Sequence, residues 1–200
     1  MDIVLKDICK SFDGKRVLMD LSATFRGGEV TCIKGPSGCG KTTLLGIIAG
    51  LVKPDSGSVS GTAGRSKAFA FQEPRLLPWK TVVENVEFAL SQEMDPDVRR
   101  ARAMSALEMV GMASESGSCP SQLSGGMAQR VSLARAIAAD AEILLLDEPF
   151  SALDVELKQR IIACLKERWA EKGTTVLMVT HSAEEAAAFP FDLVLFKTDS

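Results

Sequence analysis

The chain has 200 residues, of which 46% are hydrophobic, and it carries a net charge of −3 with an isoelectric point near 5.3. This length is enough for one domain with a sizeable buried core. The acidic balance argues against broad nucleic-acid binding, which depends on a basic surface.

The cysteines and the apolar runs limit the compartment and the membrane topology. The five cysteines are odd in number and widely spaced, without a CxxC pair, which favours a reducing cytosol over a disulfide framework or a zinc site. Met1 to Asp7 lack the basic flank and apolar stretch of a secretory signal. Leu44 to Val52, the longest apolar run, is shorter than the ~20 residues that span a bilayer, so any link to a membrane is expected through a partner.

Strand-like segments alternate with helical stretches along the chain. The expected strands are Ile3–Leu5, Val30–Ile33, Phe69–Phe71, Ile143–Leu146, Thr175–Val179 and Leu193–Leu195. Two of these are near-continuous apolar runs, which are typical of strands buried on both faces. The pattern predicts an α/β fold with a mainly parallel sheet. Turns are expected at 54–57 and 116–120.

The middle of the chain is almost wholly helical in pattern. The expected helices are Val82–Leu90, Asp97–Val110 and Gly126–Ala139. Asp95 and Pro96 suit the start of the second of these helices. We interpret this region as a helical insertion rather than a separate domain. The expected organisation is one domain over 1–200, with a core at 1–78 and 140–200 and a helical subdomain at about 79–139.

The segment Gly35 to Thr42 has the pattern of a phosphate-binding loop (P-loop), and it follows a strand and opens a helix, as such loops do. Glycines let the backbone approach phosphate oxygens, while the N–H groups at the helix start supply donors. Lys41 is expected to reach the β- and γ-phosphates, and the Thr42 hydroxyl to bind Mg²⁺. The residues expected to contact the nucleotide here are Gly35, Pro36, Ser37, Gly38, Cys39, Gly40, Lys41, Thr42 and Thr43.

Two acidic residues directly follow the apolar strand Ile143–Leu146. Because open α/β sheets hold their ligands at the carboxyl ends of their strands, Asp147 is expected to hold Mg²⁺, directly or through water. Glu148 is then placed to accept a proton from the water that attacks the γ-phosphate, or to hold that water in line. Adjacent acids are common on surfaces, but a pair after four aliphatic residues favours a site.

Two further polar residues stand at the ends of expected strands. His181, the only histidine, comes just after the strand Thr175–Val179, which favours a γ-phosphate contact over a purely structural role. Gln72 follows Phe69–Phe71 and is a candidate to contact Mg²⁺ or water. Neither residue would indicate a site in isolation.

These motifs extend over essentially the whole chain, and their identity and order resemble those of the ATP-binding cassette (ABC) family of transporter ATPases. The resemblance implies a P-loop NTPase (RecA-like) core with a mainly parallel sheet, a small antiparallel β region and a helical insertion. Phe12 resembles the aromatic that stacks on adenine, although a lone Phe could equally belong to the core. In order, the motifs are the P-loop Gly35–Thr42, the Q-loop Gln72, the signature Leu123-Ser124-Gly125-Gly126-Met127, the magnesium aspartate Asp147, the catalytic Glu148, the D-loop Ser151–Asp154 and the switch histidine His181.

In this family two cassettes pack head to tail, so that the signature of one completes the nucleotide site of the other. The resemblance implies that Ser124, Gly125 and Gly126 contact the nucleotide in trans, in a dimer expected to be a homodimer. In this family ATP closes the dimer and hydrolysis opens it, and this cycle can drive a change in a partner protein. The implied ligands are ATP and Mg²⁺. The implied catalytic residues are Lys41, Gln72, Glu148 and His181, and the implied metal-site residues are Thr42, Gln72 and Asp147.

The segment Phe71–Val86 closely resembles importer cassettes for nitrate, sulfonates, taurine and related small anions, including some that serve thiamine-precursor pyrimidines. Its apolar stretch Leu76–Trp79 would suit a groove that receives a short permease helix; local packing is the alternative. The resemblance implies a peripheral subunit at the cytoplasmic face of the cell membrane. Its implied partners are permease subunits and, through them, an extracytoplasmic solute-binding protein, with no nucleic acid.

Other functions fit the sequence less well. A soluble ABC ATPase of DNA repair or translation typically carries long coiled-coil inserts or two cassettes in one chain, and neither is visible. A P-loop kinase or GTPase would not explain Leu123–Met127, and the sole asparagine, Asn85, does not begin the NKxD motif that reads guanine. An idle scaffold would not need both Asp147 and Glu148.

Overall fold

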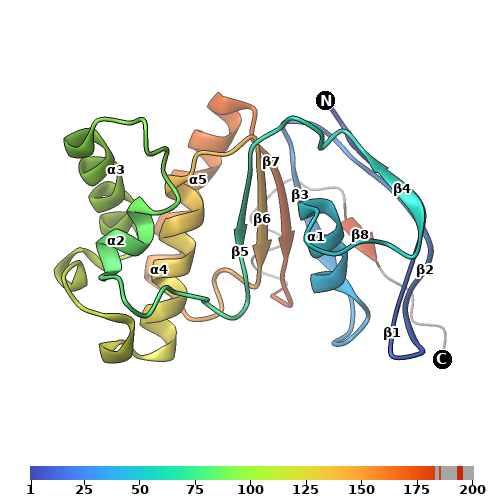
Figure 1. Cartoon of the computed structure of the whole chain (residues 1–200), viewed down its shortest axis with the longest axis horizontal. Coiled ribbons are helices and arrows are strands. Elements are labelled where there is room, and N and C mark those ends of the chain that lie inside the picture. Colours follow the sequence, from blue (N-terminus) through green and yellow to red (C-terminus); the bar gives the residue numbers. More distant parts are fainter. Residues whose placement is uncertain (183–184, 186–192, 196–200) are drawn as a thin grey trace. The chain divides into compact units, whose positions relative to one another are not determined.

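The computed structural model describes residues 1–182, 185 and 193–195 (Figure 1). The chain separates into two compact units. The first comprises Met1–Lys67, Glu142–Asp147 and Glu167–Ser200, and the second comprises Ala68–Ala141 and Glu148–Lys166. The subdomain limits expected near 79 and 139 stay a prediction. None of the helices in the described part of the chain has the length and apolar character needed to cross a bilayer.

The first unit contains four strands of a five-stranded sheet. These four follow the order β6 (Ile143–Asp147), β7 (Thr175–Val179), β3 (Val30–Lys34) and β8 (Leu193–Leu195), and each neighbouring pair among them is parallel. Every residue of β6 and β7 is buried, which explains why both strands read as continuous apolar runs. Because the strands are parallel, their carboxyl ends meet at one edge of the sheet.

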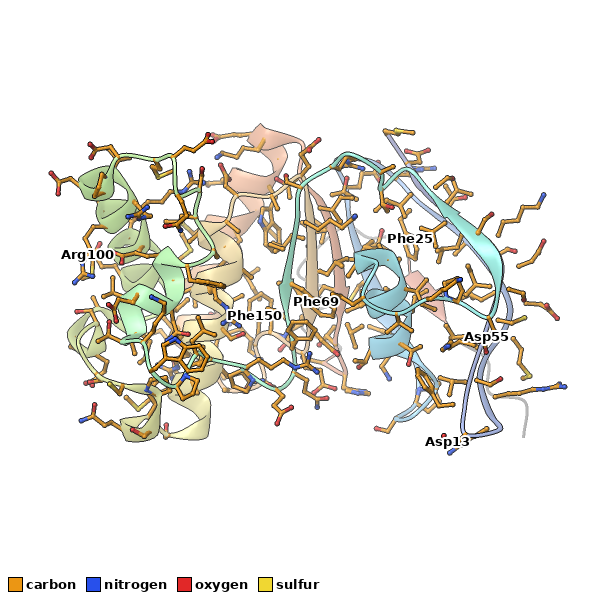
Figure 2. All side chains as sticks on the ribbon, in the orientation of Figure 1. Asp13, Phe25, Asp55, Phe69, Arg100 and Phe150 are labelled. Carbon is orange, nitrogen blue, oxygen red and sulfur yellow. The ribbon has the colours of Figure 1, made fainter. Side chains whose placement is uncertain are left out.

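A separate antiparallel sheet belongs to the same unit. Its strand order is β2 (Lys15–Phe25), β1 (Ile3–Phe12) and β4 (Ser56–Ser60). A two-residue loop joins β1 to β2, and Asp13 at the tip of this hairpin is labelled in Figure 2. Both loop residues have positive φ, 49° at Asp13 and 78° at Gly14, as tight hairpins require.

The sequence predicts only a short part of this antiparallel sheet. Ile3–Leu5 was the one strand expected there, and residues 54–57 were expected to form a turn. Strand β4 has a single partly buried residue, Val59, among exposed glycine and serine residues, so it lacks the apolar alternation that identifies a strand. Its position is set by pairing with β1, in which Val59 lies opposite Leu5.

Helix α1 (Lys41–Ala49) follows the P-loop and lies against β6 and β7. In Figure 1 it is drawn between β7 and β4. Leu44, Leu45 and Ile48 are at most 1% exposed, so the helix is fixed by apolar packing. It ends at Gly50, whose left-handed backbone donates to the carbonyls of Gly46 and Ile47.

The second unit is mainly helical. Helices α2 (Val82–Glu87), α3 (Pro96–Met109) and α4 (Gly125–Ala138) pack on one another (Figure 1). Strand β5 (Lys67–Ala70) leads into the unit, and α5 (Val155–Lys172) begins in it. All three helices expected from the pattern are present. The first ends three residues earlier than expected, and the third begins one residue earlier.

Side-chain caps set where these helices begin. Thr81 and Glu84 form a capping box at α2, in which each side chain binds the backbone N–H of the other residue. Asp95 accepts from the N–H groups of Asp97 and Val98 at the start of α3. These polar groups satisfy donors that the first turn of a helix leaves without intrahelical partners.

Gly40→Ala should destabilise the fold more than Gly38→Ala. Both glycines have positive φ, 98° and 78°, so either alanine costs on the order of 1 kcal/mol in backbone strain. A Cβ at Gly40 would also lie 2.8 Å from Leu18 Cδ2 and 3.0 Å from the Val17 carbonyl oxygen, whereas nothing lies within 4 Å of one at Gly38. This overpacking adds about 1–3 kcal/mol. Chemical denaturation measures the difference, and equal losses for the two variants would contradict it.

Glu84→Ala should lower the melting temperature more at neutral pH than in acid. The backbone N–H and the hydroxyl of Thr81 donate to Glu84 and hold the pKa of its carboxyl below the ordinary value. The stabilisation is therefore present above the ordinary pKa and is lost as the pH falls through the lowered one. Thermal unfolding at about pH 7 and about pH 3 tests this, with Glu93→Ala as an exposed control. A loss of melting temperature as large in acid as at neutral pH would refute the assignment.

Candidate functional site

The P-loop joins the end of β3 to the start of α1. Gly40 occupies the N-cap position of α1, so no side chain caps this helix, and its first turn contains no acidic residue. The Gly40 carbonyl accepts the first intrahelical bond, from Leu44 N at 2.8 Å. The helix therefore presents backbone N–H groups and the positive end of its dipole to the loop, a setting that favours an anion.

Lys41 is buried within this loop, at 6% exposed. Its ammonium donates to the carbonyl oxygens of Gly35 and Pro36, both at 2.8 Å, and lies 3.9 Å from the sulfur of Cys39. The two carbonyls are neutral acceptors. A phosphate oxygen would bind the ammonium more strongly than they do, because it adds charge to the hydrogen bond.

A hydrogen bond joins Thr42 to Asp147. The Thr42 hydroxyl donates to the Asp147 carboxylate at 2.6 Å. Asp147 ends β6, is 2% exposed and lies in register with Val179 of β7. The structure therefore brings the two residues together at the carboxyl edge of the parallel sheet.

This pair fits a magnesium ion. Mg²⁺ prefers oxygen ligands and keeps several waters, so one hydroxyl and one carboxylate beside a phosphate are a suitable protein contribution. Among the described residues, no group of three or more His, Cys, Asp or Glu side chains could hold a metal ion. The rest of the coordination shell would have to come from phosphate and water.

His181 lies at the same sheet edge, after β7 and the buried Thr180. His181 is an exposed residue. Thr180 donates to the buried Glu185, and its hydroxyl oxygen accepts from Ser182 N at 3.0 Å. The Ser182 hydroxyl oxygen in turn accepts from Glu185 N at 3.2 Å. These bonds hold Thr180 and Ser182, the residues on either side of His181.

Phe12 ends β1 in the first unit and is 46% exposed. The ammonium of Lys10 lies 5.1 Å from the centre of its ring and also pairs with Asp55 at 2.7 Å. An exposed ring can stack on a base, so the adenine contact stays a prediction for this residue.

The second unit holds the Q-loop. Gln72 is an exposed residue just after β5. The guanidinium of Arg75 lies 4.1 Å from the centre of the Phe71 ring. Arg135 of α4 donates to the carbonyls of Pro74 and Arg75 at 2.9 and 3.0 Å. Helix α4 therefore anchors the backbone that follows Gln72.

The signature residues form the start of α4 in this unit. Ser124 is the N-cap, and its hydroxyl oxygen accepts from Met127 N at 3.2 Å. Its own O–H proton is still available for donation to another group. Gly125 and Gly126 are the first helical residues, and the first turn contains no acidic side chain. This helix start is therefore suited to an anion, as the α1 start is.

Glu148 has an uncommon backbone conformation. Its φ is 50°, in the left-handed region that glutamate rarely adopts. Its carbonyl oxygen accepts from the Ser151 hydroxyl at 3.0 Å. Uncommon conformations of this kind often occur at functional sites, where surrounding contacts maintain them.

Sequence patterns did not reveal the side chains that hold these loops. Gln129, whose amide donates to the Gln72 carbonyl and the Ser151 hydroxyl, and Arg135 look like ordinary polar positions of a helix. Glu185 lies among other acidic and alanine residues. Each of these side chains holds a loop by a hydrogen bond to a backbone or side-chain group that is distant in the sequence or a few residues away. A single sequence carries no periodic signal for such contacts.

Comparison with known proteins gives consistent matches. A family model described as ABC transporter matches residues 18–151. The chain is 42% identical over 192 residues to the taurine import ATP-binding protein TauB of Yersinia pestis bv. Antiqua (strain Antiqua), covering 92% of this chain and 75% of that protein. It is 45% identical over 192 residues to the aliphatic sulfonates import ATP-binding protein SsuB 1 of Streptomyces avermitilis, covering 96% and 71%.

A solved structure gives the same result for the fold. It is the dimeric post-hydrolysis state of the ATP-binding cassette MJ0796 bound to ADP and Pi, with a TM-score of 0.89 and 33% identity. The match covers 98% of this chain and 94% of that one. The likeness confirms the P-loop NTPase fold expected from the motifs. The chain belongs to the ABC transporter family.

Proposed function

We propose that this chain is the ATP-binding and ATP-hydrolysing subunit of an ABC importer, in which ATP-driven pairing of two cassettes is coupled to uptake of a small sulfonate-like anion. The hydrogen bond between Thr42 and Asp147 beside the P-loop is the observation that carries the ATPase. The importer class rests on relatives named as taurine and aliphatic sulfonate import proteins. These names favour sulfonates over nitrate or pyrimidines, and an importer over a soluble repair or translation ATPase.

Nucleotide binding in this proposal uses the P-loop and the start of α1. Lys41 exchanges its two carbonyl acceptors for β- and γ-phosphate oxygens. The backbone N–H groups of the first turn of α1 bind the remaining phosphate oxygens. Phe12 stacks on the adenine.

Thr42 and Asp147 hold Mg²⁺, with Gln72 as a further candidate ligand. The ion, when bound, neutralises charge on the phosphates as the transition state forms. Burial of Asp147 fixes the direction of its carboxylate.

Hydrolysis requires a positioned water. Glu148 accepts a proton from that water as the water oxygen attacks the γ-phosphorus. The bond between the γ-phosphorus and the oxygen that bridges to the β-phosphate then breaks. His181 contacts the γ-phosphate. The products are ADP and phosphate.

A second cassette completes the site in this proposal. Ser124, Gly125 and Gly126 of one chain bind the γ-phosphate held by the P-loop of the other. Support comes from the exposed start of α4, at Ser124 and Gly125, and from the dimeric MJ0796 structure. Because these groups bind ATP only when two chains meet, ATP favours the closed dimer and its hydrolysis favours opening.

The surface of the second unit around Trp79 is suited to contact with a permease. The buried Asn85 accepts from Leu77 N at 2.7 Å and donates to the carbonyl of Lys80 at 3.1 Å, which fixes the segment around Trp79. Trp79 is 74% exposed, an uncommon position for so large an apolar ring.

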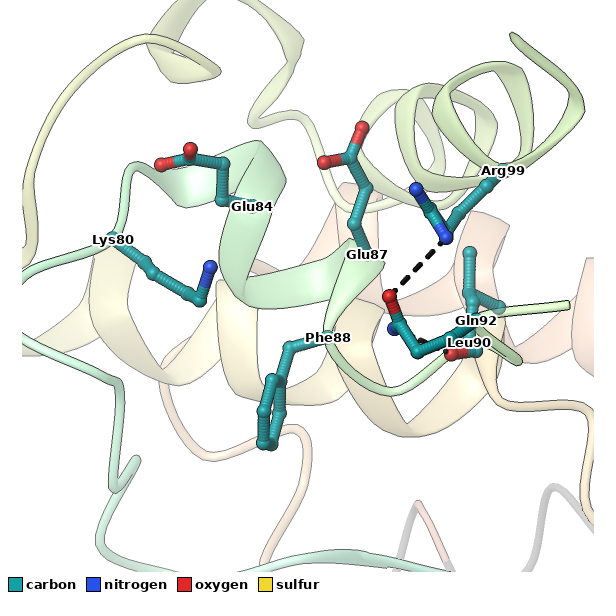
Figure 3. A pocket seen from close by; sticks show the side chains of 7 residues that line it. All are labelled: Lys80, Glu84, Glu87, Phe88, Leu90, Gln92 and Arg99. Atoms are coloured by element: carbon teal, nitrogen blue, oxygen red, sulfur yellow. Dashed lines mark hydrogen bonds between the residues drawn. The ribbon is translucent and has the colours of Figure 1, made fainter. Parts of the chain in front are cut away.

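Residues that follow Trp79 in the sequence, on α2 and up to the start of α3, line a hollow of about 440 Å³ (Figure 3). Its lining residues are Lys80, Glu84, Glu87, Phe88, Leu90, Gln92 and Arg99. It combines an exposed aromatic ring with charges of both signs, which suits a short amphipathic helix. The permease would hold the chain at the cytoplasmic face of the membrane and receive the anion from an extracytoplasmic solute-binding protein.

Glu148→Gln tests the catalytic assignment. The amide keeps the shape of the side chain but cannot accept a proton, so ATP should still bind while turnover falls by at least about a hundredfold. Size-exclusion chromatography with ATP should show a trapped dimer. Gln159→Met, at an exposed position on α5, is the control. Hydrolysis at the wild-type rate by the Glu148 variant would exclude Glu148 as the main catalytic carboxylate.

A further inference from the structure

Gln129 connects two loops that are far apart in the sequence. Its Nε2 donates to the carbonyl oxygen of Gln72 at 3.5 Å and to the hydroxyl oxygen of Ser151 at 3.0 Å. The Ser151 hydroxyl in turn donates to the carbonyl oxygen of Glu148 at 3.0 Å. All four residues belong to the second unit. One side chain of α4 is therefore bonded to the Q-loop backbone and, through one hydroxyl, to the backbone of Glu148.

The chemistry of the end groups fixes the direction of these bonds. Carbonyl oxygens only accept, so the Ser151 hydroxyl gives its single proton to Glu148 and must accept from Gln129. The amide of Gln129 carries two N–H donors, one for each acceptor. A carboxylate or an apolar side chain at 129 could not supply both donors.

Glu148 depends on such support because its backbone is in the left-handed region, with φ at 50°. Conformations of this kind persist when surrounding contacts hold them. The direction of the Glu148 side chain follows from its backbone, so a shift at this residue would move the carboxylate away from the attacking water.

Two further contacts join the start of α4 to the loop after Glu148. An added Cβ at Gly126 would lie 3.5 Å from the Ala152 Cβ, which places the two backbones close together. Arg130 pairs with Asp154 at 3.6 Å. The Leu157 N–H lowers the pKa of the Asp154 carboxyl and so favours its charged form.

We propose that Gln129 is a positioning residue for ATP hydrolysis, which holds the backbone of Glu148 through Ser151 and the Q-loop through the Gln72 carbonyl. This inference rests on the proposed ATPase function. It also assigns a second role to α4, because the helix whose first residues serve the partner's nucleotide supports the catalytic glutamate of its own chain.

The test uses Gln129→Met, Ser151→Ala and the double variant, each made in the whole chain. Methionine keeps the length and helix propensity of glutamine but removes the amide. Each single variant should lower kcat roughly three- to tenfold, with the KM for ATP and the melting temperature near wild type. Because both changes break the same chain of bonds, the double variant should lose no more than the worse single variant. Ser151→Thr keeps the hydroxyl and should restore most of the rate.

Gln159→Met, an exposed glutamine of α5, is the matched control. Wild-type kcat in Gln129→Met, or losses that multiply in the double variant, would overturn the inference. A fall in melting temperature and ATP affinity together, without a selective fall in kcat, would also overturn it by showing a merely structural role. Absence of hydrolysis in the wild type and in Gln159→Met would instead refute the proposed function, and the inference with it.

Discussion

The hydrogen bond between Thr42 and Asp147 determines how the first unit can act on a nucleotide. It links the first turn of α1 to the end of β6, and so places a hydroxyl and a carboxylate side by side at the carboxyl edge of the sheet. A carboxylate that is 2% exposed requires such a partner, because burial of an unsatisfied polar group is costly. The same edge carries the P-loop after β3 and His181 after β7. The parallel register of the three strands is therefore what makes a phosphate and metal site possible there.

In the second unit, α4 has the corresponding organising role. Its N-terminus presents Ser124, Gly125 and Gly126, and its later turns bind the backbone of the Q-loop through Gln129 and Arg135. The helix thus combines an end that is suited to an anion with contacts that hold the loops to which we assign a part in hydrolysis. A group that engages the helix start would act on an element already bonded to those loops. Such an arrangement can link the two nucleotide sites of a dimer without an additional structural element.

The sequence was sufficient for the motifs and for the most buried elements. Strands β6 and β7 are covered on both faces, so their apolar runs are unambiguous, and the P-loop has a pattern that few other structures require. Strand β4 was missed because its residues are mostly exposed, and its pairing with β1 is a long-range contact. The role of Gln129 was invisible for the same reason, since its partners lie 57 and 22 residues away. Patterns of single residues report burial and turns, whereas these contacts depend on the folded chain.

In the proposed dimer the signature of one chain completes the nucleotide site of the other, and mixing two inactive variants shows whether it does. Ser124→Arg blocks the signature, and Lys41→Ala removes the P-loop ammonium, so each variant alone should lose hydrolysis. In a mixed dimer one site combines the intact P-loop of the first variant with the intact signature of the second. An equal mixture should therefore recover about a quarter of the wild-type rate, since half of the dimers have one working site of two. A mixture as inactive as its components would contradict the composite site.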